Sequence, residues 1–230
     1  MSSSYKTNGI ILSRRDYLEA DRIYTIITPG QKVSAIAKGI RKSNAKLASH
    51  LDLFAEIELM FVRGKSLDII TSARTITHVD ISDDYDKLQV GFLFLEMVNK
   101  LTDTEDIGGV YDLLASHIQL LEELPLSVCE LGFKLKLLAE LGHKPDMMSP
   151  EGILESNLGL DTEHGKLVDV NLPLANRLDP DHIKLWRLLL DKPTRQVARV
   201  GGAITAAEKS MAVCDQFIKQ QFGVNFRAKN

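Results

Sequence analysis

The sequence has little of what disulfide-linked, zinc-binding or membrane-spanning proteins need. Its 230 residues include two cysteines, one tryptophan and 6% aromatic residues. Cys129 and Cys214 form no Cys-x-x-Cys pair, so neither a disulfide framework nor a thiolate zinc site is indicated, and both are expected to be buried. The longest apolar cluster is interrupted by Glu96 and is far shorter than the ~20 residues of a membrane span. The first residues lack the apolar core of a signal peptide, and we expect a cytoplasmic protein.

Motifs typical of catalytic sites are also missing. The sequence contains no G-x-x-x-x-G-K-[ST] phosphate loop, no G-x-S-x-G elbow and no H-E-x-x-H helix, and its six histidines are dispersed. Acidic pairs such as Asp83–Asp84 and Glu122–Glu123 invite comparison with two-metal nucleases. Adjacent residues on a helix point in different directions, however, so these pairs are better interpreted as caps and solvated charges. The sequence therefore predicts no enzyme and no cofactor.

The net charge of −3 hides a strong segregation of charge along the chain. Residues 1–75 contain 12 Lys and Arg against 7 Asp and Glu (+5), residues 76–183 contain 7 against 21 (−14), and residues 184–230 contain 9 against 3 (+6). Such asymmetry indicates a polyanionic partner for the basic part, although solvated surfaces would show the same counts.

Short runs rich in Ile, Val, Thr and Tyr alternate with turn signals over the first 75 residues, as in a small sheet or barrel. Between two of these runs, Pro29 and Gly30 predict a type II turn. Five strands are predicted, at residues 9–12, 22–27, 32–38, 56–61 and 67–71. This pattern favours a five-stranded OB-fold; an SH3-like barrel or an open meander stays possible, because periodicity does not give strand order.

Beyond residue 80 the hydrophobic period becomes helical. Helices are predicted from a cap at Ser82, near 108–122, over 126–141, over 182–190, and from a capping box at Thr205–Glu208 to Gly223. Residues 143–175 are punctuated by Pro and Gly. The sequence therefore predicts an α+β protein: an N-terminal five-stranded OB-fold β-barrel (1–78) followed by a C-terminal all-α helical domain (79–230), with 143–175 irregular.

One stretch, SAIAKGIRKSNAKL at residues 34–47, concentrates positive charge without a carboxylate. It places Lys38, Arg41, Lys42 and Lys46 at the end of the third strand and in the loop that follows. Such a loop suits a phosphate backbone, because each neutralised phosphate releases condensed counterions. Further cations that extend the patch in this interpretation are Lys32, Arg14, Arg15, Arg63 and Lys65.

Aromatic residues for base stacking are few in this part of the chain. The candidates are Tyr5, Tyr17, Tyr24, Phe54 and Phe61, and the strand alternation buries some of them. Binding should therefore depend on phosphates, with little sequence preference and a steep salt dependence. A merely solvated loop is the alternative.

Residues 9–76 resemble the N-terminal domain of the bacterial recombination mediator RecO family. The matching elements are a strand at Gly9–Leu12, then Asp16, Tyr17, Glu19 and Asp21, then Ala35, Ala37, Lys38, Gly39 and Arg41. The close match covers about 70 residues, and the order of elements continues into a helical domain.

The resemblance implies a non-enzymatic protein that binds single- and double-stranded DNA and anneals complementary strands. With its partner RecR, it would help to load RecA on single strands coated by single-strand binding protein, in the cytoplasm at the nucleoid. Family contacts to DNA lie on the basic face of the OB domain, which implies Lys38, Arg41 and Lys42 at matching positions. The remaining cations come from the charge argument alone.

Many RecO proteins carry a four-cysteine zinc site after an element that corresponds here to residues 141–146. The following stretch, 147–171, has no cysteine, and His143 and His164 do not make a replacement set. No metal is predicted. This segment is then either mobile or held by packing of its apolar side chains, Ile153, Leu154, Leu158, Leu160 and Leu167.

The resemblance also implies that the helical domain holds the acidic C-terminal tail of single-strand binding protein. Such a tail needs an apolar groove with a cation at its rim, predicted on the 126–141 helix at Phe133, Lys134 and Lys136. Two other functions stay open. An RNA-binding OB-fold factor would not anneal DNA, and an adaptor acting through the helical half would tolerate charge reversal in the basic loop.

Overall fold

The structure, a computed structural model, describes residues 3–104, 108–173 and 175–226. The chain divides into two compact units, Met1–Glu122 and Glu123–Asn230. No helix in the described ranges is long and apolar enough to span a membrane.

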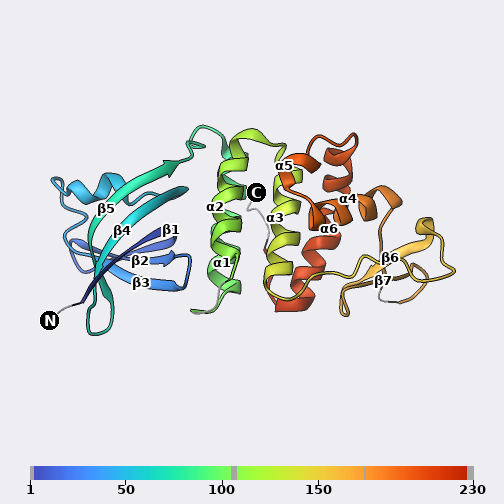
Figure 1. The fold of residues 1–230 in the computed structure, drawn as a ribbon, viewed down its shortest axis with the longest axis horizontal. Coiled ribbons are helices and arrows are strands. Elements are labelled where there is room, and N and C mark those ends of the chain that lie inside the picture. Colours follow the sequence, from blue (N-terminus) through green and yellow to red (C-terminus); the bar gives the residue numbers. More distant parts are fainter. Residues whose placement is uncertain (1–2, 105–107, 174, 227–230) are drawn as a thin grey trace. The chain divides into compact units, whose positions relative to one another are not determined.

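The first unit begins with a closed five-stranded barrel (Figure 1). The strand order is β1-β2-β3-β5-β4, with β4 pairing back to β1. β3 and β5 are parallel, whereas the other pairs are antiparallel. This is the Greek-key order of an OB-fold, so the predicted barrel is confirmed and the meander is excluded. The strands are β1 (Ser4–Tyr17), β2 (Asp21–Ile27), β3 (Lys32–Ala37), β4 (Ala55–Val62) and β5 (Asp68–His78).

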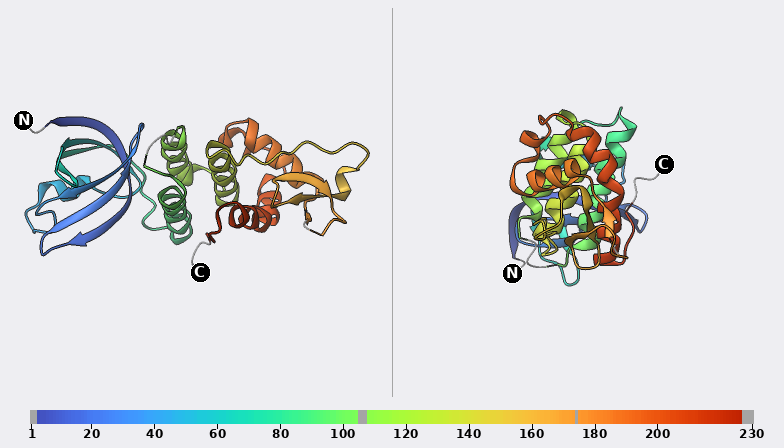
Figure 2. Two further views of the ribbon diagram at one scale, coloured as in Figure 1. Left: turned by 90° about the horizontal axis from the view of Figure 1, so that it is seen from below. Right: turned by 90° about the vertical axis from the view of Figure 1, so that its right-hand side faces the viewer.

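The barrel core is built from side chains that point inward from each strand, and the alternation is strict on β4. On β4, Ile57, Leu59 and Phe61 are buried while the residues between them are partly exposed. Because successive side chains of a strand point to opposite faces, one face of each strand fills the barrel interior. The left view in Figure 2 shows these strands curving around that interior.

Helices α1 (Tyr85–Leu101) and α2 (Val110–Glu123) follow the barrel. The Lys32 ammonium donates to the backbone oxygens of Asn99, at 2.9 Å, and of Thr102, near the end of α1. The Tyr111 hydroxyl of α2 donates to Oε1 of Glu56 on β4, at 2.7 Å. Both helices belong to the first compact unit, Met1–Glu122.

The second unit contains four helices in its described part: α3 (Leu126–Glu140), α4 (Pro180–Asp191), α5 (Thr194–Val197) and α6 (Ala203–Phe222). The buried Trp186 of α4 donates its indole N–H to the Ser210 hydroxyl of α6, at 3.0 Å. Between α3 and α4 lies a three-stranded sheet in the order β7-β6-β8. Its strands are β6 (Leu158–Asp161), β7 (Lys166–Asp169) and β8 (Ala175–Arg177).

This sheet corrects the prediction of an all-α second half and of an irregular segment at 143–175. Leu158, Leu160 and Leu167 are buried by the sheet and Ile153 is half-buried, whereas Leu154 is 72% exposed. The sequence pattern concealed these strands because each is only three or four residues long, too short to display a period.

Three local predictions were wrong. The N-cap of α1 is Asp84, whose carboxylate accepts the Lys87 N–H at 3.1 Å, and not Ser82. Helix α6 starts after Gly202, so Thr205 lies inside the helix. The φ of Gly30 is not positive, which excludes the type II turn.

Candidate nucleic-acid interface

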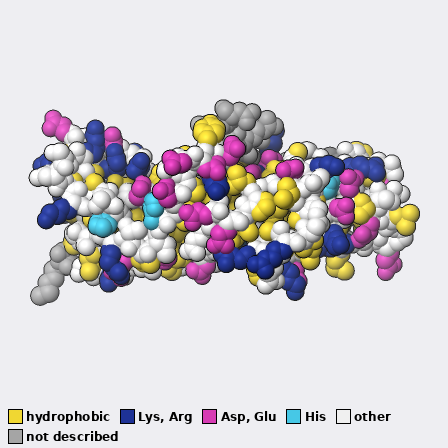
Figure 3. Space-filling view, turned by 90° about the horizontal axis from the view of Figure 1, so that it is seen from above, with side chains coloured by type: hydrophobic (Ala, Val, Ile, Leu, Met, Phe, Trp, Pro, Cys, Tyr) yellow, Lys and Arg dark blue, Asp and Glu magenta, His cyan; other side chains and the backbone are white. Residues whose placement is uncertain are grey.

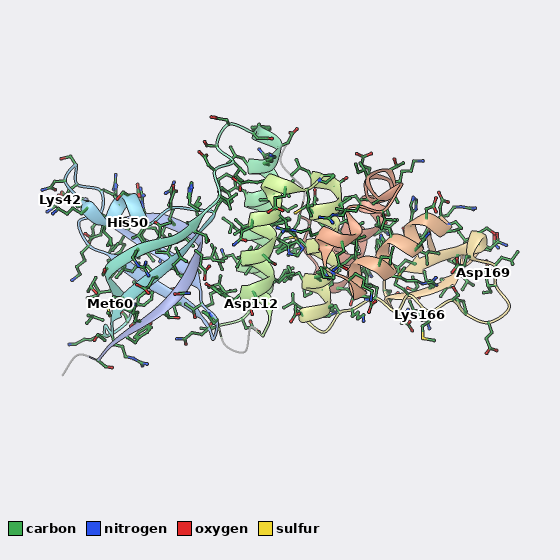
Figure 4. All side chains as sticks on the ribbon, turned by 45° about the horizontal axis from the view of Figure 1, so that its top comes forward. Lys42, His50, Met60, Asp112, Lys166 and Asp169 are labelled. Atoms are coloured by element: carbon green, nitrogen blue, oxygen red, sulfur yellow. The ribbon has the colours of Figure 1, made fainter. Side chains whose placement is uncertain are left out.

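The β1–β2 turn and the β3–β4 connection meet at one end of the barrel. The Arg41 N–H donates to the Ala20 carbonyl oxygen at 3.0 Å, and the Gly39 N–H donates to Oδ1 of Asp21 at 2.7 Å. Gly39 has φ +65°, a conformation that glycine adopts without a steric cost. These bonds hold the start of the connection against the turn. In Figure 4, the labelled Lys42 and His50 lie at this end of the barrel.

We call Lys38, Arg41, Lys42 and Lys46 the basic loop. All four side chains are exposed. Within the described ranges, Lys38, Lys42 and Lys46 form no ion pair, whereas Arg41 lies 3.4 Å from the Asp16 carboxylate. The space-filling view in Figure 3 shows Lys and Arg side chains gathered at the barrel, with acidic side chains among them.

Arg14 and Arg15 extend this surface along β1. Both are exposed, and they pair across the strands with Tyr24 and Ile23. The neighbouring Asp16 accepts a hydrogen bond from Arg22 at 2.8 Å. That bond, together with the positive charges of Arg22, Arg41 and Arg14, lowers the pKa of Asp16. Asp16 therefore stays ionised and neutralises part of the cluster, while the lysines of the basic loop remain available for phosphates.

Three predicted cations lie elsewhere on the barrel: Lys32, Lys65 and Arg63, whose guanidinium lies 5.5 Å from the centroid of the Tyr5 ring. Lys32 and Lys38 are at opposite ends of β3, and the Lys32 ammonium is held by the end of α1. Burial lowers the pKa of Lys32, and the negative charge of Asp103, which favours the protonated ammonium, offsets only part of this effect. Lys65 is exposed but precedes Asp68, which pairs with Ala35 in the parallel β3–β5 ladder, so it lies toward the Lys32 end.

The aromatic candidates are largely structural. Tyr24, Phe54 and Phe61 are buried, and Tyr5 is stacked on Phe61 at a centroid distance of 5.0 Å. Tyr17, at the β1–β2 turn beside the basic loop, is 44% exposed. The phosphate-weighted interpretation of this surface therefore stands as a prediction, with Tyr17 as the aromatic residue next to the cations.

The residue that sequence reasoning missed is Leu18. It follows Tyr17 in the turn, is 72% exposed, and has φ +50°. The available signal was an apolar residue between Asp16 and Asp21, in the connection between the strands predicted at 9–12 and 22–27, where polar side chains and glycine are the rule.

Comparison with known proteins identifies the family. Residues 1–79 match the protein family described as "Recombination protein O N terminal", and residues 82–230 match the family described as "Recombination protein O C terminal". The chain belongs to the recombination protein O family. The resemblance to RecO is thereby confirmed, and the basic loop lies within the N-terminal match.

Several relatives are named DNA repair protein RecO. The one from Roseiflexus sp. is 29% identical over 146 residues, that from Dehalococcoides mccartyi 30% over 147, and that from Nostoc sp. 36% over 146. Each alignment covers 62% of this chain and 52%, 58% and 48% of the respective relative. The chain thus matches about half the length of these relatives.

The residues at the position of the family's zinc segment do not fit a zinc ion. The structure contains no group of three His, Cys, Asp or Glu side chains that could hold a metal within the ranges it describes. His143 hydrogen-bonds to Gln221 at 3.0 Å and His164 to Asp161 at 2.8 Å, so each imidazole already has a protein partner. Both cysteines, Cys129 and Cys214, are buried as predicted.

The residues predicted for the partner tail do not form a groove rim. Phe133 is buried, and the Lys136 ammonium donates to the Lys192 carbonyl oxygen at 3.0 Å. Lys134 is 1% exposed and lies 2.5 Å from Glu130 and 2.6 Å from Asp215. Burial lowers the pKa of Lys134, but these two carboxylates outweigh the burial and raise it. Lys134 is therefore charged, paired and closed to a peptide carboxylate.

A cavity of about 890 Å³ does open beside Lys134, between α3 and α6. Its charged lining residues are Glu130, Lys134, Glu208, Asp215 and Lys219, which sum to a net negative charge. An acidic peptide would be repelled there, so this cavity does not replace the predicted groove.

Proposed function

We propose that the chain is a DNA-binding recombination mediator that holds single- and double-stranded DNA on the basic loop. One observation carries the proposal: three exposed lysines without ion pairs in the described ranges lie on a loop anchored to the β1–β2 turn of an OB-fold. Unpaired cations on a preformed loop bind phosphates at little cost, because no internal ion pair is broken.

The finer activities rest on the resemblance to the family, and the names of the relatives support only a role in DNA repair. They are annealing of complementary strands and, with RecR, assistance in loading RecA on single strands coated by single-strand binding protein. RecR and the tail of single-strand binding protein are proposed as partners without an assigned surface.

The test is binding of a fluorescent single-stranded oligonucleotide across a salt series. The test variant is the triple change Lys38→Glu, Arg41→Glu, Lys42→Glu. Its matched control is Lys144→Glu, Lys166→Glu, Arg177→Glu, which makes the same change of charge on exposed side chains of the second unit. Affinity of the wild type should fall steeply with salt. A plot of the logarithm of the binding constant against the logarithm of the salt concentration should have a slope of about −0.7 for each phosphate neutralised on a single strand.

We expect the test variant to lose most of its affinity. Its salt slope should become shallower by about 2, because three phosphate contacts are lost. The control should retain both. Annealing of complementary DNA strands should fall with binding in the test variant. Equal binding by the wild type and the test variant would contradict the proposal. Preserved annealing in that case would favour an adaptor acting through the helical half, and binding of RNA without annealing of DNA would favour an RNA-binding factor.

A further inference from the structure

We infer that the β1–β2 turn is a base-contacting wedge, in which Leu18 inserts beside unpaired DNA bases while the basic loop holds the phosphates. This inference rests on the proposed function, because it assigns a second, chemically different role at the same surface. It starts from Leu18, whose side chain is 72% exposed at the tip of the turn.

An exposed leucine is ordinary by itself, but its backbone here is not. Leu18 has φ +50°, the left-handed conformation that favours glycine and asparagine and disfavours a branched apolar residue. A glycine or asparagine would fit this turn with less strain. Unfavourable backbone conformations persist where the surrounding structure enforces them, and they concentrate at binding sites.

The surroundings of Leu18 do enforce its conformation. The turn is tied to the β3–β4 connection by the hydrogen bond from the Arg41 N–H to the Ala20 carbonyl oxygen and by that from the Gly39 N–H to Asp21. The Arg41 guanidinium also lies 3.5 Å from the Leu18 carbonyl oxygen. The tip is therefore presented in one preformed geometry, which reduces the entropy lost when a ligand binds.

The distribution of charge indicates that phosphates and bases contact different parts of this surface. The turn and the start of β2 carry the acidic residues Glu19 and Asp21, so they do not attract phosphates. The lysines of the neighbouring basic loop attract them. A strand whose phosphates track the loop would place its uncharged bases toward the tip, where Leu18 and the partly exposed Tyr17 offer apolar contact.

Apolar side chains of this kind separate neighbouring bases by inserting between them. Leucine is among the residues that proteins use as such wedges, and an exposed tyrosine can stack on an unpaired base. Both actions require bases that are not held in a duplex, or a duplex that is locally opened. The inferred ligand is therefore unstacked, single-stranded DNA.

The test uses the full chain and an oligonucleotide containing 2-aminopurine, whose emission rises when neighbouring bases unstack. The variants are Leu18→Asn, which suits the left-handed backbone and removes the apolar side chain, and Leu18→Met, which keeps an apolar side chain. Leu154→Asn is the matched control, because Leu154 is also 72% exposed but belongs to the second unit.

We expect the wild type, Leu18→Met and Leu154→Asn to raise the emission and Leu18→Asn to lose most of the rise. Leu18→Asn should bind about tenfold more weakly, the equivalent of leaving much of a leucine side chain unburied. Its salt slope should be unchanged, because no phosphate contact is removed.

Full emission from Leu18→Asn, or wild-type binding without any rise, would overturn the wedge and leave phosphate binding intact. A reduced salt slope in Leu18→Asn would also overturn it, because the side chain would then act on phosphate contacts. Absence of DNA binding by the wild type would overturn the proposed function itself.

Discussion

Gly91 shows how one missing side chain brings a helix onto the barrel. A Cβ at this position of α1 would lie 2.7 Å from Cε1 of Phe54 and 3.2 Å from Cδ1 of Ile81. Phe54 is itself buried with φ +59°, and its ring meets Phe92 edge-on at 5.2 Å. Close packing of this kind leaves no room for even a methyl group.

We expect Gly91→Ala to destabilise the protein by about 1–3 kcal/mol, the usual cost of overpacking a core. Urea unfolding followed by circular dichroism measures the change. Gly30→Ala is the control, because nothing lies within 4 Å of its Cβ position and its φ is not positive. A Gly91→Ala variant as stable as the wild type would show that Phe54 moves aside freely.

At the scale of elements, the β6–β7 hairpin depends on one carboxylate. Asp161 is buried, and its Oδ1 accepts the N–H groups of Glu163 at 3.0 Å and His164 at 3.1 Å. Burial raises the pKa of Asp161, but the bonds from Glu163 and His164 outweigh burial and lower it. The carboxylate thus closes the turn that links the two strands.

A folded-state pKa below the unfolded value of about 3.9 stabilises the protein above that pH. This stability is lost as the pH falls through the lowered pKa. We expect Asp161→Asn to reduce stability at pH 7 by about 1–2 kcal/mol, typical of hydrogen bonds to a charged group. The difference from the wild type should begin to shrink below about pH 4, where the carboxyl of the unfolded chain takes up a proton, and should disappear once the pH is below the lowered pKa of folded Asp161.

Trp186 provides the measurement, because it is the single tryptophan of the sequence and lies buried in the second unit. Its fluorescence during urea unfolding reports on the unit that contains the hairpin. Glu163→Gln is the control, since this exposed side chain makes the same change of charge. If the difference in unfolding free energy between Asp161→Asn and the wild type did not change with pH, the charge of the carboxylate would be excluded as its cause.

For the whole molecule, segregation of charge matters more than net charge. The protein carries −3 overall, yet residues 1–75 carry +5 and residues 76–183 carry −14. A local positive surface can bind a polyanion even when the net charge is negative, because screening in salt limits each interaction to about 10 Å.

We therefore expect the wild type to be retained at pH 8 and low salt on both a heparin column and an anion exchanger. The Lys38→Glu, Arg41→Glu, Lys42→Glu variant should elute from heparin at lower salt and from the anion exchanger at higher salt. The Lys144→Glu, Lys166→Glu, Arg177→Glu control should shift only on the anion exchanger. Equal loss of heparin retention in both variants would mean that the net charge of the protein, and not the position of the basic loop, determines binding to heparin.

Patterns that depend on neighbours in the chain were predictable. The alternation of β4 and the helices α3 and α4 appear close to their predicted positions, and α6 ends before Gly223, which has φ +68°. Helix caps and turns were less predictable, because several neighbouring residues in the sequence are able to form the same cap or turn. Ser82 bonds to Asp80 at 2.7 Å and leaves the cap of α1 to Asp84.

The sequence by itself determined the short strands of the first 75 residues, the main helices of the remainder, the burial of both cysteines and the basic loop, because each depends on local composition and period. The strand order that makes the barrel an OB-fold, and the β7-β6-β8 sheet, came from the tertiary structure. Only the tertiary structure decided which cations share a surface. It directs Lys32 to the end of α1, pairs Lys134 with Glu130 and Asp215, and holds Leu18 at the tip beside Arg41. The physical reason is that a charge or an exposed side chain acquires its role from partners distant in the sequence, and only packing brings those partners together.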